Sequence, residues 1–179
     1  MTDEDVMALF LGIRQEAFRL EQRDSYENVD TEDELFAAWR AGRSIHRTPA
    51  TSPWLDLVAG HAAAGRRVYR VRIVDWPLSE YTRYELASYA DNVAAGEEVY
   101  VVDRDAHPDH AALIEDFWLF DNDTATVMRY DDDGRPLDPA PGDARDHRDR
   151  RETALAHALP LVEWIAAHRQ ALEERALSA

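Results

Sequence analysis

The sequence contains neither cysteine nor lysine, so all 20 of its Lys and Arg positions are arginine. The absence of cysteine excludes disulfides, thiolate nucleophiles and zinc sites with cysteine ligands. The absence of lysine excludes Schiff-base chemistry and the phosphate-binding lysines of P-loop proteins and protein kinases. Mechanisms that need a titratable ammonium side chain are therefore excluded.

Positive charge is also scarce, because 36 acidic residues against 20 basic ones give a net charge of −16. The densest arginine cluster, at 145–151, is interleaved with aspartates. This charge disfavours direct nucleic-acid binding, which normally needs a concentrated basic face. No apolar run is long enough to span a membrane, and the acidic N-terminus lacks the positive region of a signal peptide. We therefore expect a cytoplasmic protein.

The N-terminal region, residues 1–52, is predicted to be helical. Apolar residues recur at helical spacing over 3–21, which predicts an amphipathic helix. A second helix is expected from Thr31, with Glu34 in the capping-box position, to Gly42. Residues 43–52 are predicted to form a loop.

The central region, residues 53–134, has the pattern of a sheet. We predict a helix over 53–64, a strand over 68–74, a helix after Ser79 that ends at Gly96, and a strand over 98–102. The last three form a βαβ unit with parallel strands. Residues 107–116 are expected to be a short helix or loop, and strands over 117–121 and 124–130 to form a hairpin.

The C-terminal region, residues 135–179, is predicted to be an exposed loop over 135–150 followed by a helix over about 151–176. Pro160 either kinks this helix or opens its second half. The chain is long enough for one domain and has no linker. We expect a single α/β (or α+β) domain with a mixed sheet of four or five strands and flanking helices.

The segment from 70 to 85 carries the candidate ligand site. Side chains two apart on a strand share a face, and helical residues four apart do the same. The loop between the strand and the helix lies at the carboxyl end of the strand, where ligands often bind in open α/β sheets. Guanidiniums, phenols and a carboxylate can hold an anion or a small polar molecule. The candidates are Arg70, Arg72, Trp76, Tyr81, Arg83 and Glu85.

A structural interpretation of the same residues stays open. Arg70 and Arg72 can instead form an ion-pair network with Glu85 and Glu97, because half-buried arginines usually have structural partners. Trp76 lies in a loop beside Pro77, and an exposed aromatic there would serve recognition. Trp118 lies in a predicted strand that is apolar on both faces, and it is interpreted as a core residue.

Metal and cofactor sites find little support. His107 and His110 are three residues apart but lack a third defined ligand, and the run Asp131–Asp133 lacks the spacing of an EF-hand. The dinucleotide-binding, nucleophile-elbow and zinc-protease motifs are missing. We expect no metal and no cofactor.

Several distinctive motifs follow one another along the chain, among them Phe36-x-x-Trp39-x-x-Gly42, Arg70-Val-Arg-Ile-Val, Pro77-Leu-Ser-x-Tyr-x-Arg-x-Glu85 and Asp116-Phe-Trp-Leu-Phe-Asp121. This series resembles that of an uncharacterised actinobacterial family, a domain of unknown function. Members of that family are often encoded beside helix-turn-helix regulators. The resemblance covers nearly the whole chain and implies a regulatory context, with such a regulator as a possible partner.

The order of elements over 53–130 is also similar to one half of a phospholipase-D-like domain. In that superfamily the last strand carries a His-x-Lys pair, in which His attacks phosphorus and Lys neutralises the phosphate. The matching stretch here has Asp116, Phe117 and Trp118. The resemblance therefore implies a non-catalytic relative.

We interpret the chain as a non-catalytic binding or regulatory module that senses a small polar or anionic ligand, or contacts a partner protein such as a helix-turn-helix regulator. One alternative is a hydrolase or phosphodiesterase that uses Glu85 with His107 or His110 as an acid–base pair. A second alternative is an acidic DNA mimic, which would need carboxylates at phosphate spacing.

Overall fold

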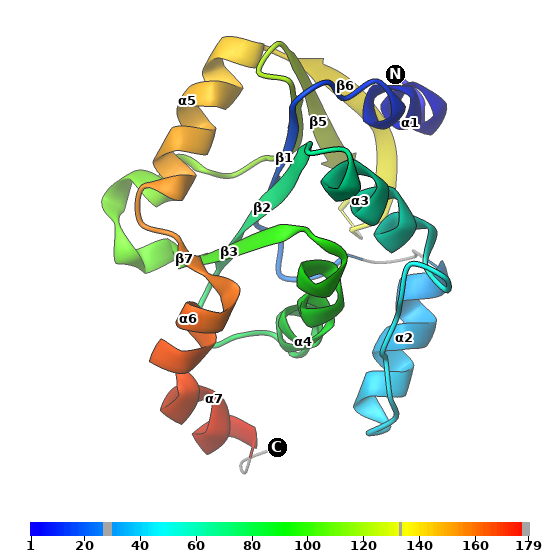
Figure 1. The fold of residues 1–179 in the computed structure, drawn as a ribbon. Coiled ribbons are helices and arrows are strands. Elements are labelled where there is room, and N and C mark those ends of the chain that lie inside the picture. The colour runs from blue at the N-terminus through cyan, green and yellow to red at the C-terminus, as the bar shows by residue number, and fades with distance from the viewer. Residues whose placement is uncertain (27–29, 133, 177–179) are drawn as a thin grey trace.

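The computed structural model describes residues 1–26, 30–132 and 134–176. Its centre is a seven-stranded mixed sheet with the order β6-β5-β4-β1-β2-β3-β7 (Figure 1). The strands are β1 (Glu16–Glu21), β2 (Arg67–Val74), β3 (Glu98–Asp103), β4 (Asp116–Phe120), β5 (Thr124–Tyr130), β6 (Pro136–Gly142) and β7 (Leu159–Pro160). The mixed α/β sheet is confirmed, but it has seven strands rather than four or five.

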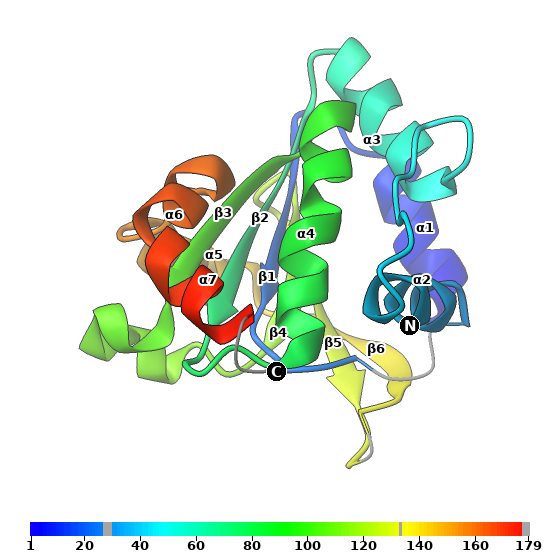
Figure 2. The same ribbon diagram turned by 90° about the horizontal axis from the view of Figure 1, so that it is seen from below.

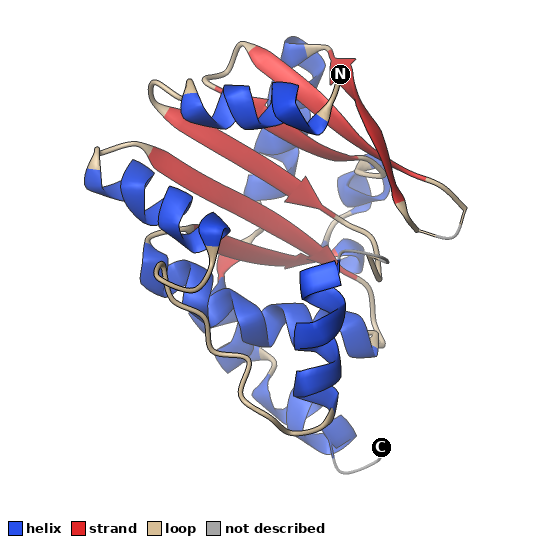
Figure 3. Ribbon diagram, turned by 90° about the vertical axis from the view of Figure 1, so that its right-hand side faces the viewer, coloured by secondary structure: helices blue, strands red, loops and turns tan. Residues whose placement is uncertain are grey.

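The described residues contain seven α-helices and two short 3-10 turns (Figure 3). The helices are α1 (Asp3–Leu11), α2 (Asp30–Arg40), α3 (Pro53–Ala63), α4 (Glu80–Ala95), α5 (Ala144–Leu155), α6 (Leu161–Ala167) and α7 (Arg169–Ala176). The turns cover 104–106 and 108–112. None of these helices combines the length and the apolar character needed to cross a membrane.

The predicted helix over 3–21 is wrong in its second half. Helix α1 ends at Leu11, Gly12 follows as its C-cap, and the chain then enters β1. Strand β1 lies at the centre of the sheet, parallel to β2 and antiparallel to β4. The N-terminal region is therefore not wholly helical, because it contributes a central strand. Helix α2 agrees with the predicted helix, although the side chain of Thr31 lies outside the described residues.

The predicted βαβ unit is confirmed. Strands β2 and β3 pair in parallel, and α4 crosses between them. Ser79 caps α4 by accepting a hydrogen bond from the Thr82 N–H. The helix ends at Gly96, whose φ of 106° suits glycine. The hairpin of β4 and β5 is also confirmed, with Asp121 and Asn122 at positive φ in its turn.

The prediction for 135–176 is wrong in two respects. Residues 136–142 form β6, the outer partner of β5, and the polar residues of 144–155 form α5, capped by Asp143. The single helix expected over 151–176 is divided into the end of α5, the short strand β7, α6 and α7. Pro160 stands at the N-cap of α6, so it opens a helix and does not kink one.

The two faces of the sheet differ in chemistry. One face is apolar: Phe18, Leu20, Val71 and Ile73 pack with residues of β4 and with Ala154 of α5. The other face is covered by α1, α3 and α4, which lie on the same side of the sheet (Figure 2). This second face, which we call the charged face, carries Arg19 and Glu21 of β1 and Arg70 and Arg72 of β2.

Candidate functional site

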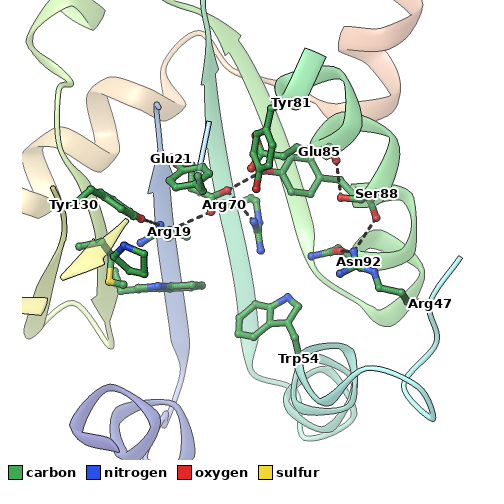
Figure 4. A pocket seen from close by; sticks show the side chains of 15 residues that line it. Arg19, Glu21, Arg47, Trp54, Arg70, Tyr81, Glu85, Ser88, Asn92 and Tyr130 are labelled. Atoms are coloured by element: carbon green, nitrogen blue, oxygen red, sulfur yellow. Dashed lines mark hydrogen bonds and ion pairs between the residues drawn. The ribbon is translucent and has the colours of Figure 1, made fainter. Parts of the chain in front are cut away.

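A cavity of about 320 Å³ lies over the charged face, between α3 and α4 on one side and β5 on the other (Figure 4). Its floor is formed by β1, β2 and β4. The residues that line it come from segments far apart in the sequence: Arg19, Glu21, Tyr26, Arg47, Trp54, Arg70, Tyr81, Glu85, Ser88, Tyr89, Asn92, Trp118, Met128, Tyr130 and Pro136. The size fits a small organic ligand.

Arg70 is the centre of the floor. Its Nε donates a hydrogen bond to Oε1 of Glu97 at 2.5 Å, and its Nη1 donates to Oε2 of Glu21 at 2.8 Å. The Tyr89 ring lies 4.9 Å from the guanidinium. Arg70 therefore joins β1, β2 and the end of α4 through its side chain.

A second arginine, Arg72, ties the floor to α4. Its Nη2 lies 2.8 Å from Oε2 of Glu85, and it also donates to the carbonyl oxygen of Arg23 and to Thr82 Oγ1. The Tyr89 hydroxyl donates to Glu21 at 2.9 Å and lies within 3.4 Å of Glu85. The two arginine clusters thus form one network.

The network continues to β4 through Arg19. Its Nε donates to Glu21 Oε1, and its Nη2 donates to Asp116 Oδ2 and to the Tyr130 hydroxyl. The Tyr26 hydroxyl donates to the same Asp116 oxygen at 2.5 Å. Each buried carboxylate on this face therefore has more than one partner, as buried charges require.

The network shifts the pKa values of its acids in opposite directions. Burial alone would raise the pKa of Glu21, but Arg70, Arg19 and Arg72 outweigh it and lower the pKa to about 2. At Asp116 burial dominates over Arg19 and raises the pKa above its usual value. Burial, opposed by Arg19, raises the pKa of Tyr130 to about 12. Glu21 therefore stays ionised, whereas Asp116 takes up a proton more readily than an ordinary aspartate does.

Aromatic rings form the walls of the cavity. Trp54 of α3 and Trp118 of β4 lie 5.7 Å apart between ring centroids. Tyr26 contacts both Tyr81 and Tyr130 by edge or tilted geometry. The Trp54 indole N–H donates to Glu97 Oε2, so its ring is fixed. The cavity thus combines a charged floor with flat apolar walls.

The predicted site residues are only partly brought together. Arg70, Tyr81 and Glu85 line the cavity, and Arg72 lies beneath it with its side chain 1% exposed. Arg83 is half-buried on α4 and does not line this cavity. The proposed ion pairs of Arg70 with Glu97 and of Arg72 with Glu85 are both present. The structural network and the cavity therefore use the same residues.

Trp76 lies apart from this cavity and is not an exposed aromatic. It is half-buried, and its ring stacks on Trp164 of α6 at 6.0 Å, with His168 at 5.7 Å. The peptide bond between Trp76 and Pro77 is cis. Trp76 thus packs the loop after β2 against the C-terminal helices.

The carboxyl ends of the parallel strands, where we expected the ligand, are instead joined by Arg104. Its Nε donates to both carboxylate oxygens of Asp75, and its Nη2 donates to the carbonyl and side chain of Gln22. Its Nη1 donates to the carbonyl of Leu113. Arg104 cross-links this edge, which also carries a second pocket lined by Gln22, Arg23, Asp24, Ser25, Asp75 and Arg104. The cavity described above lies further back over the face of the sheet.

Sequence reasoning missed the residues that β1, α3 and the β4–β5 hairpin contribute. Arg19 and Glu21 were assigned to a helix, and Trp118 was assigned to the core. Alternation along the chain could have identified Arg19 and Glu21 as strand residues. Phe18 and Leu20 alternate with Ala17, Arg19 and Glu21. In the same way, apolar residues alternate with Arg70 and Arg72 in β2.

His107 and His110 are placed far from Glu85. The His107 ring stacks on His157 at 4.3 Å between centroids, just beyond α5. Helix α5 covers the apolar face, whereas Glu85 lies on the charged face. Within the described residues, no group of three or more His, Asp or Glu side chains is arranged to hold a metal ion.

Comparison with protein families gives one match. Residues 4–166 match the model of a family described as a domain of unknown function (DUF6879). The match spans every element that lines the cavity. A search of curated proteins gave no match.

Proposed function

We propose that this chain, which belongs to the DUF6879 family, is a non-catalytic binding module that holds a small polar ligand in the cavity over its charged face. The observation that supports this is a buried ionic network that is open to a cavity. Protein interiors are close-packed, so a purely structural network would be covered by side chains. Here Arg70, 7% exposed, and Glu21, 9% exposed, line a cavity of about 320 Å³.

The arrangement favours binding over catalysis. An acid–base pair must lie within hydrogen-bond reach of a common substrate. Glu85 is paired with Arg72, and the histidines of the hydrolase hypothesis lie beside α5 on the other side of the sheet. The remaining cavity carboxylate, Glu21, is held as an anion by its arginine partners, so it is a poor proton donor.

The resemblances noted from the sequence support a regulatory setting. We infer a cytoplasmic, actinobacterial protein that acts with a helix-turn-helix regulator, for which ligand sensing is a natural role. By analogy with the phospholipase-D-like domain, Asp116 and Trp118 occupy the strand that carries the catalytic pair there. In this chain Trp118 lines the cavity and Asp116 is bonded to Tyr26 at its edge. The position of the catalytic site in that superfamily would then bind a ligand here without catalysing a reaction.

A fragment screen by thermal shift tests the proposal with two matched variants. Ser88→Leu adds bulk to the cavity wall from α4, and Ala87→Leu places the same side chain at the preceding, exposed position of that helix. We expect fragments that raise the Tm of the wild type and of Ala87→Leu but not that of Ser88→Leu. A screen in which no fragment distinguishes the two variants would refute a ligand site in this cavity.

A further inference from the structure

We propose that the ligand is an uncharged planar molecule that presents carbonyl oxygens, such as an aryl amide, imide or lactone. This inference rests on the proposed function and concerns the chemical class of the ligand. It follows from three properties of the cavity: its unused hydrogen-bonding atoms, its charge and the shape of its walls.

The carboxylate oxygens on the floor of the cavity already accept hydrogen bonds. The carboxylate oxygens of Glu21 receive Arg19, Arg70 and Tyr89, and those of Glu97 receive Arg70, Trp54 and Asn92. Buried acceptors on the floor are therefore occupied. A donor on the ligand would have to share a carboxylate oxygen that already accepts at least one hydrogen bond.

Guanidinium nitrogens remain unused. Arg19, 5% exposed, has a buried Nη1 that makes no hydrogen bond within the described chain. Arg70 binds its two glutamates through Nε and Nη1, and its Nη2 has no hydrogen-bond partner there. Both side chains line the cavity, but Arg19 Nη1 has almost no accessible surface, so Arg70 Nη2 is the donor that a ligand reaches directly. A buried donor without an acceptor costs about 1–3 kcal/mol, so a ligand that supplies acceptor oxygens is favoured.

The balance of charge around the cavity indicates that the acceptor oxygens of the ligand belong to an uncharged group. The guanidiniums in or directly under the cavity equal the carboxylates in number: Arg19, Arg47, Arg70 and Arg72 against Glu21, Glu85, Glu97 and Asp116. Arg19, Arg70 and Arg72 form ion pairs with these carboxylates, and Arg47 donates to the carbonyl oxygen of Ser88 and to Asn92 Oδ1. An added anion or cation would bring an uncompensated charge into a poorly solvated space. A carbonyl oxygen satisfies the donors without that penalty.

The walls select a flat ligand. The Trp54 and Trp118 rings, together with Met128, form an apolar side opposite the polar residues Ser88 and Asn92 of α4. Such a cavity accepts a ring against the indoles while a polar edge meets the floor.

Three conjugated aryl probes with the same number of non-hydrogen atoms and different charge test the class: benzamide, benzoate and benzamidinium. Binding is followed by the indole N–H signals in ¹H–¹⁵N NMR spectra, assigned with single Trp→Phe variants. Trp54 and Trp118 report on the cavity, whereas Trp76 and Trp164, stacked against each other elsewhere, are internal controls. We expect the amide to shift only the first pair and to bind at least fivefold more tightly than either ion.

Two variants distinguish specific recognition of the amide from nonspecific binding. Arg70→Lys keeps the positive charge but removes the forked donor, and should reduce amide binding at least fivefold. Ser88→Leu should abolish binding by filling the cavity, and it remains informative if Arg70→Lys does not fold by circular dichroism.

The possible failures are separable. Tighter binding of benzoate or benzamidinium overturns the neutral class and leaves the binding module intact. The same holds if none of the three probes shifts the Trp54 and Trp118 signals while other fragments do. If no fragment shifts those signals, both the class and the proposed function are refuted.

Discussion

The guanidinium of Arg72 lies 2.8 Å from the carboxylate of Glu85, and both side chains are more than nine-tenths buried. The pair joins a central strand to the helix that covers it. Taking two charges out of water is costly, so such a pair stabilises the fold only while both partners are present.

Removal of one partner should therefore be severe. We expect Arg72→Met to lower the free energy of unfolding by about 3–5 kcal/mol, because it leaves Glu85 buried without its cation. The double variant Arg72→Met/Glu85→Leu should lose less than the sum of the two single variants. Urea denaturation of the three variants and the wild type gives this coupling.

The exposed ion pair of Arg40 with Glu80 is the matched control, since its side chains are 59% and 55% exposed. Arg40→Ala should cost less than about 1 kcal/mol. Additive losses in the buried pair would contradict the coupling that the geometry indicates.

A pH-dependent contribution to stability is expected at Asp121. Burial tends to raise the pKa of this carboxylate, but the backbone N–H groups of Arg14, Gln15 and Glu16 outweigh it and lower the pKa to about 2. Because the folded pKa lies below the unfolded value of 3.8, the stabilisation is complete above pH 3.8 and is lost as the pH falls toward 2.

Asp121→Asn should remove that contribution. Asparagine tolerates the positive φ of this turn, so the change tests the charge rather than the backbone. We expect a loss of about 1–3 kcal/mol at pH 7 and a smaller difference from wild type at pH 2. Chemical denaturation across pH 2–7 measures it, and a difference independent of pH would argue against this role.

Trp76 should matter for stability and not for ligand binding. Trp76→Ala removes the stack on Trp164, so we expect a loss of about 1–3 kcal/mol and looser attachment of α6. Hydrogen exchange over 161–167 reports the attachment, and fragments found for the cavity should bind unchanged. If Trp76→Ala abolished the binding of these fragments, Trp76 would have to be counted among the ligand-recognition residues.

Prolines protect the edges of the sheet. Strand β6 contains Pro136, Pro139 and Pro141, and the opposite edge strand β7 contains Pro160. Proline cannot donate a ladder hydrogen bond, which blocks pairing with another chain. We expect Pro139→Val/Pro141→Val to associate at high concentration, as seen by size-exclusion chromatography with light scattering. If the double variant kept the oligomeric state of the wild type, features other than these prolines would protect this edge.

The fold was predictable where local chemistry specified it. Ser79 and Gly96 mark the ends of α4, and the β-branched run before Pro77 marks β2. Strand β1 was missed because its apolar residues continue a helical spacing from α1, and only the pairing with β2 and β4 makes them a strand. Helix α5 was missed because its sequence is polar on nearly all sides and contributes few buried residues, among them His147 and Ala154.

The site was predictable only in its central strand and helix. Arg70 and Glu85 were found because their spacing placed them on the inner faces of β2 and α4. Their actual partners include Glu21, which is 49 positions from Arg70. Trp118 reaches the cavity through the antiparallel pairing of β4 with β1, and no local sequence pattern predicts that pairing.

The unlike faces of β1 and β2 also fix how these strands can pair. Phe18 and Leu20 alternate with Arg19 and Glu21, and a shift of one residue would exchange the faces. The shifted strand would place Arg19 or Arg70 in the apolar core and leave Glu21 with no cation opposite. Because an unpaired buried ion costs several kcal/mol, each wrong alignment is penalised at several positions at once. The charged face thus acts during folding as a check on strand alignment, before any ligand is present.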